Sequence, residues 1–116
     1  MQPESAALIW DALDAANTIG EFLDGISRDD YAQDRLRRRA VEREFEIVGE
    51  ALNKLSRVDV DTAARVPGLR EAVGLRNVLI HGYAEIVDGR VYDTVIQNLP
   101  GLVSALANLL DEAGQP

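Results

Sequence analysis

The stretch that decides the fold is VEREFEIVGEAL, residues 41–52. Its apolar residues recur three or four positions apart, at Val41, Phe45, Val48 and Leu52. Because a helix turns by about 100° per residue, this spacing places them on one face and predicts an amphipathic helix. Gly49 costs such a helix roughly 1 kcal/mol relative to alanine, and the close approach of another helix would explain its presence.

Working outward, the same periodicity predicts one long helix from about Ser27 to Ser56, with Ser27 as its N-terminal cap. A first helix is predicted over residues 5–25, and another from Pro67 through residue 81. A last helix is predicted over residues 91–109, where Pro100 is expected to kink it or split it in two.

The connections are predicted from residues that favour turns and caps. Residues 57–62 show no clear period and are expected to form a loop, with Asp59 or Asp61 capping a short helical turn that runs through Val66. Asp88-Gly89 is typical of a turn.

The chain as a whole is predicted to be one all-α domain. No stretch of useful length alternates between apolar and polar residues as a strand does, and there is no internal repeat or linker. The 116 residues, 47% of them hydrophobic, are enough for one core. We therefore expect residues 1–116 to form an up-and-down bundle of four main helices plus a short one.

Composition excludes several classes of site. With no cysteine there is no disulfide, thiolate chemistry or cysteine zinc site, and a single histidine argues against a histidine-rich metal site, so we expect no metal and no cofactor. No apolar run is long enough to span a membrane and the N-terminus lacks a signal-peptide pattern. A soluble protein of the cytoplasm with no membrane partner is expected.

Charge gives two alternatives for nucleic-acid binding. The net charge of −8 disfavours nonspecific binding, which usually depends on a basic field. One basic cluster nevertheless lies in the second predicted helix, and it contains Arg35, Arg37, Arg38, Arg39 and Arg43. This cluster is either a solvated face balanced by nearby acids or a strip that binds RNA phosphates, for which Arg35, Arg38, Arg39 and Arg43 are the candidates.

The candidate site is the stretch GLRNVLIHGY, residues 74–83, which places polar groups within an otherwise apolar segment. Asn77 and His81 are four apart, so Asn77 could hydrogen-bond the imidazole and hold its tautomer. Arg76 and His81 are five apart, about 140° around a helix, and would not point at one atom. Their convergence is therefore expected to need a second copy of the chain.

These residue types suit metal-free cleavage of RNA by its own 2′-hydroxyl group. That reaction needs a proton acceptor or donor that titrates near neutrality, a role for histidine. It also needs positive charge on the phosphate, which arginine supplies through several donors. Tyr83 could donate a hydrogen bond to the phosphate or hold the substrate.

The motif that results, arginine, four residues, histidine, one residue and tyrosine, resembles that of the HepT-like toxins in the HEPN ribonuclease superfamily. Here it is formed by Arg76, His81 and Tyr83, with Asn77 in the polar position beside the arginine. Residues 41–52 resemble the long second helix of that family, and residues 91–100 its last helix.

The resemblance implies a helical homodimer with an active cleft between the subunits. It implies a metal-independent endoribonuclease toxin in which Arg76, His81 and Tyr83 are catalytic and Asn77 supports them. Its partner would be a minimal nucleotidyltransferase antitoxin, which can inactivate such a toxin by transferring AMP to the motif tyrosine, here Tyr83.

Two other kinds of protein stay open from the sequence. The chain could be a non-catalytic subunit that binds nucleotide or presents substrate to a nucleotidyltransferase. It could also be a purely structural helical dimer. An RNA-cleavage assay separates the first interpretation from both, and nucleotide binding separates these two.

Overall fold

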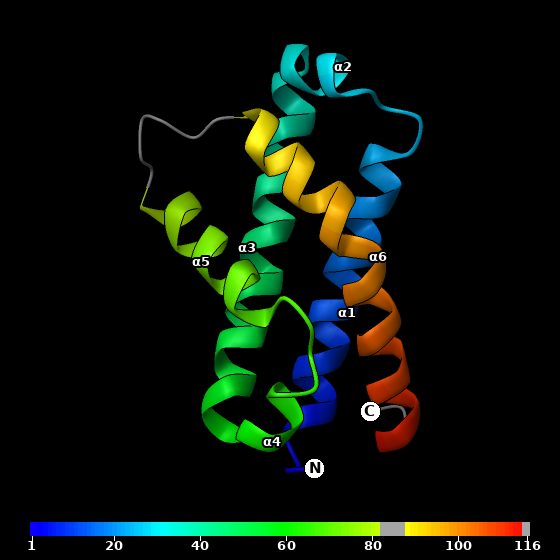
Figure 1. The fold of residues 1–116 in the computed structure, drawn as a ribbon, viewed down its shortest axis with the longest axis vertical. Coiled ribbons are helices and arrows are strands. Elements are labelled where there is room, and N and C mark those ends of the chain that lie inside the picture. Colours follow the sequence, from blue (N-terminus) through cyan, green and yellow to red (C-terminus); the bar gives the residue numbers. More distant parts are fainter. Residues whose placement is uncertain (82–87, 115–116) are drawn as a thin grey trace.

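The computed structural model describes residues 1–81 and 88–114, and this part of the chain forms a bundle of six helices (Figure 1). In chain order they are α1 (Ser5–Leu23), α2 (Arg28–Gln33), α3 (Arg35–Val58), α4 (Val60–Ala63), α5 (Leu69–Ile80) and α6 (Asp88–Ala113). No strand occurs among the described residues, and the all-α prediction is confirmed. Four helices are long, as predicted, and α2 and α4 are short.

The central helix is α3, which packs against α1 and against α5 (Figure 1). Its core-facing side chains Val41, Val48, Leu52 and Leu55 have no exposed surface. Because full burial of such a side chain contributes about 1.5–3 kcal/mol, this face is a main source of the stability of the fold. Further contacts join α6 to α1 and to α2.

The single long helix predicted from Ser27 to Ser56 is wrong at Asp34, where the chain breaks into α2 and α3. Ser27 caps α2 as predicted, because its hydroxyl accepts the N–H of Asp30 at 3.0 Å. Asp34 has φ −108° and ψ 90°, and its carboxylate accepts the N–H of Arg37 at 3.0 Å. A carboxylate that bonds the nearby backbone competes with the helix, and here it begins a new one.

The loop predicted over residues 57–62 is also wrong, because α3 runs to Val58 and α4 begins at Val60. Of the two caps considered, Asp59 is the one the structure uses, and its Oδ1 accepts the N–H of Thr62 at 3.2 Å. The α4 helix itself ends at Ala63.

Two other helix ends differ from the prediction. The fifth helix begins at Leu69 instead of Pro67, after Gly68, whose φ of 75° suits glycine. The last helix begins at Asp88, where a turn was predicted, and runs through Pro100 without being split. Its axis changes direction between the yellow and the red parts in Figure 1.

None of the helices in the described part of the chain combines the length and the apolar character that crossing a bilayer requires.

Candidate active site

Arg76 and Asn77 lie on α5, the helix that covers one side of α3 (Figure 1). Arg76 is half-buried and Asn77 is exposed. His81 is exposed and forms the C-terminal cap of the helix. Tyr83 lies outside the described residues, so its predicted roles in catalysis and as the site of AMP transfer stay predictions.

The orientation of α5 follows from its apolar residues. Ala72, Leu75 and Leu79 recur at helical spacing and are 5%, 5% and 8% exposed, respectively, so this face is buried. The opposite face must then be open, and it carries Asn77 and Ile80, the latter 44% exposed. Asn77 therefore lies on the solvent-facing side of the helix, and Arg76 lies beside it.

The Arg76 side chain is held by its neighbour in the sequence. Its Nη1 donates to Oδ1 of Asn77 at 2.9 Å, and among the described residues this is the only hydrogen bond of the guanidinium. A guanidinium has five N–H donors, so four of them bond no other group within residues 1–81 and 88–114. The asparagine was predicted to bond the imidazole of His81, and that contact stays a prediction; the backbone N–H of His81 donates to the carbonyl of Asn77 at 3.2 Å.

The predicted approach of another helix to Gly49 is confirmed, and the helix is α5 at Arg76. The sequence identified the glycine, but it did not connect the glycine to the candidate site. No pattern in the sequence shows which helix covers which position of α3.

Within one chain, Arg76 and His81 do not converge by helix geometry. His81 has right-handed helical dihedrals, φ −79° and ψ −6°, so helical rotation continues from Arg76 to His81. Five helical positions separate the two side chains by about 140°. The angular separation that the sequence predicts for Arg76 and His81 on an unbroken helix therefore applies up to His81, the cap of α5.

The basic cluster is partly engaged with the protein itself. Arg38 donates from Nη1 to the carbonyl of Ala32 at 2.5 Å, and Nη1 of Arg39 lies 3.3 Å from Oε1 of Glu42. Glu42 itself is 9% exposed.

Two members of the cluster keep their charge open to solvent. Arg35 and Arg43 are exposed, and within the part of the chain that the structure describes their side chains pair with no other residue. Both interpretations of the cluster therefore stay open, and Arg35 and Arg43 are its exposed cations without a partner among the described residues.

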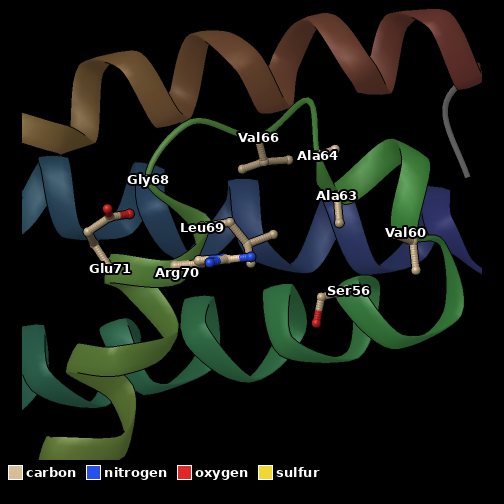
Figure 2. A pocket seen from close by; sticks show the side chains of 9 residues that line it. All are labelled: Ser56, Val60, Ala63, Ala64, Val66, Gly68, Leu69, Arg70 and Glu71. Carbon is tan, nitrogen blue, oxygen red and sulfur yellow. The ribbon is translucent and has the colours of Figure 1, made fainter.

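A pocket of about 450 Å³ lies elsewhere, between the end of α3, α4 and the start of α5 (Figure 2). Figure 2 shows Val66, Leu69 and Arg70 among the side chains at its wall. Neither Arg76 nor His81 is among the described residues that line it. Arg76 and His81 thus lie outside this pocket.

No metal-binding group of three or more histidine and carboxylate side chains occurs among residues 1–81 and 88–114.

Comparison with known proteins identifies relatives along most of the chain. The family model described as "Ribonuclease HepT-like" matches residues 12–109. A curated protein of Methanocaldococcus jannaschii is 34% identical over 94 residues, which cover 81% of this chain and 85% of that protein. One of Caldanaerobacter subterraneus is 30% identical over 92 residues, covering 79% and 81%. Both bear the name "Putative RNase". No solved structure matches the chain significantly.

Proposed function

The chain belongs to the HepT-like ribonuclease family, and from this premise we propose that it is a metal-independent endoribonuclease toxin that acts through Arg76 and His81. One structural observation carries the assignment of the site. The exposed end of α5 carries the only histidine of the protein, and five residues earlier lies a guanidinium that, among the described residues, has one donor on Asn77 and four without a partner.

The proposed reaction uses the RNA's own nucleophile. The 2′-oxygen attacks the adjacent phosphorus, the bond from phosphorus to the 5′-oxygen breaks, and a 2′,3′-cyclic phosphate and a 5′-hydroxyl result. A proton must leave the 2′-hydroxyl and another must reach the departing 5′-oxygen, and His81 moves protons in these steps. Arg76 stabilises the negative charge that grows on the phosphate.

The proposed enzyme is a homodimer with its cleft between the subunits. The angular separation of Arg76 and His81 supports this. One helix does not direct both side chains at the same phosphate, and a second chain could supply the other one. The exposed Ile80, which lies next to His81 at 44% exposure, is an apolar side chain that such a contact could cover. The exposed Arg35 and Arg43 would contact RNA phosphates outside the cleft.

The function is tested by cleavage of RNA by the purified protein. We expect cleavage that persists in EDTA, that yields 2′,3′-cyclic phosphate ends, and that His81→Ala and Arg76→Ala each abolish with the helical spectrum unchanged. Full activity in His81→Ala, or loss of activity in EDTA, would contradict the proposal. A protein that binds nucleotide but cleaves no RNA would favour the partner-subunit alternative.

The proposed antitoxin is a minimal nucleotidyltransferase that transfers AMP to Tyr83. This tyrosine is two residues beyond His81, and an AMP group there would bring negative charge and bulk to Arg76, the group needed for the RNA phosphate. Co-expression with a nucleotidyltransferase encoded beside the chain should add the mass of AMP to the chain but not to Tyr83→Phe. Neutralised toxicity with an unchanged mass would show that the antitoxin acts by binding alone.

A further inference from the structure

The contact between α3 and α5 has no room for a side chain at one position. A Cβ placed on Gly49 would lie 2.2 Å from Cβ of Arg76, 2.7 Å from its Cγ and 3.1 Å from the carbonyl oxygen of Ala72. The first two distances are shorter than non-bonded carbon atoms tolerate. Only glycine fits at this position without a shift of its surroundings.

The identity of the overlapping atoms decides what would have to move. Cβ of Arg76 is bonded directly to its backbone, so no rotamer of the arginine can carry it away. The carbonyl of Ala72 is backbone as well. Relief of the overlap therefore requires α5 itself to move away from α3. Ordinary contact begins at 3.4 Å, so from 2.2 Å the displacement is on the order of 1 Å.

Gly20 and Gly74, two other helical glycines, do not share this contact. A Cβ at Gly20 of α1, which also faces another helix, would meet Cδ2 of Leu99 at 3.8 Å, an ordinary contact distance. A Cβ at Gly74, two residues before Arg76 on α5, would meet no atom within 4 Å. Of these three glycines, only Gly49 is pressed against atoms that a side-chain rotation cannot move.

We infer that Gly49 is a positioning residue for Arg76, and this inference rests on the proposed function. Because Gly49 has no side chain, Cβ of Arg76 can pack directly against α3. This contact determines where the guanidinium meets the RNA phosphate. Catalytic groups misplaced by about 1 Å can lose on the order of 100-fold in rate. Gly49→Ala should therefore impair catalysis although it touches no substrate.

The first measurement compares kcat and KM of Gly49→Ala with those of Gly20→Ala, the matched change at a helix contact with room. Both are assayed well below their melting midpoints, with helical content and mass checked. We expect kcat of Gly49→Ala to fall by about 100-fold with KM changed much less, and Gly20→Ala to match the wild type. A folded Gly49→Ala with wild-type kcat would overturn the inference.

The second measurement needs no activity and covers the case in which Gly49→Ala does not fold. Arg76→Gly removes the overlapping Cβ, so Gly49→Ala should lower the melting midpoint by several degrees in the wild type and by much less in the Arg76→Gly background. Folding of Gly49→Ala only when combined with Arg76→Gly would support the inference too. Equal decreases of the melting midpoint in the wild-type and Arg76→Gly backgrounds would overturn the inference. A double variant that also fails to fold would overturn it too. If the wild type cleaves no RNA, the proposed function fails, while this cycle still decides whether the contact exists.

Discussion

Ser5 at the start of α1 donates its hydroxyl to the carboxylate of Asp59, with Oγ 2.7 Å from Oδ2, and both residues are buried. The same Oδ2 accepts the backbone N–H of Gln2 at 2.9 Å and the hydroxyl of Thr62 at 2.7 Å. One carboxylate thus joins the N-terminal residues to the junction of α3 and α4.

The first prediction concerns acid stability. The N–H of Gln2, then the hydroxyls of Ser5 and Thr62, favour the charged form and hold the pKa of Asp59 far below its usual range. A carboxylate whose pKa is lower in the folded state stabilises the fold above its unfolded pKa and loses this contribution as the pH falls. Asp59→Asn should therefore lower the unfolding free energy at pH 7 and flatten its decline below about pH 5.

The matched control for Asp59 is Asp61→Asn, an exposed carboxylate in the first turn of α4. Urea unfolding of both variants and the wild type from pH 7 to about pH 2.5 makes the comparison. If Asp59→Asn follows the wild-type pH profile, Asp59 is not the group whose protonation weakens the fold.

A second prediction concerns Gly89 on α6, where an added Cβ would also overlap a neighbour, Nη2 of Arg28, at 2.1 Å. Here the neighbour is the far end of a long, exposed side chain, paired with Asp93 at 3.1 Å. The guanidinium can move, and an exposed pair contributes only about 0–1 kcal/mol. Gly89→Ala should change the unfolding free energy by less than about 1 kcal/mol in urea unfolding, since alanine also favours the helix. A loss above about 2 kcal/mol would mean that the pair holds α2 on α6 more strongly than its exposure suggests.

The features that the sequence could predict were those carried by periodicity. The stripe through Val41, Val48 and Leu52 predicted α3, and Gly49 predicted a close helix neighbour, because both depend on residues of one helix. The break at Asp34 was missed, since an aspartate fits a polar helix face as well as a cap, and only its bond to Arg37 distinguishes the two.

The candidate site was predictable in part for the same reason. The spacing of Arg76 and His81 is a property of one helix, and it held to the cap at His81. The packing of Arg76 against Gly49 depends on how α5 crosses α3. The spacing of residues along one helix does not contain that information.

The third prediction concerns Asn77, whose Oδ1 accepts from Nη1 of Arg76 at 2.9 Å. Asn77→Ala removes one hydrogen bond that orients the guanidinium, and we expect kcat/KM to fall by about 10-fold, roughly 1.4 kcal/mol in transition-state stabilisation. Asn77→Asp should be worse, because a carboxylate beside the arginine competes with the RNA phosphate for it. The control is Asn98→Ala on α6, where the lost bond is to the carbonyl of Thr94. Equal activities for Asn77→Ala, Asn77→Asp and the wild type would show that Arg76 needs no such partner.

The last prediction tests whether two chains complete the site. On one α5 helix Arg76 and His81 diverge by about 140°, so we expect each cleft to use Arg76 of one chain and His81 of the other. Arg76→Ala and His81→Ala, each inactive alone, are co-expressed with different affinity tags, and the mixed dimer is isolated by both tags in turn. Such a dimer has one cleft with both substitutions and one intact cleft, and should cleave RNA at about half the wild-type rate.

Light scattering confirms that the isolated species has the mass of two chains, and the doubly substituted chain carrying both tags is the inactive control. A mixed dimer with no activity would show that both groups act from the same chain, and a wild-type protein that cleaves RNA with the mass of one chain would show that no second copy is needed.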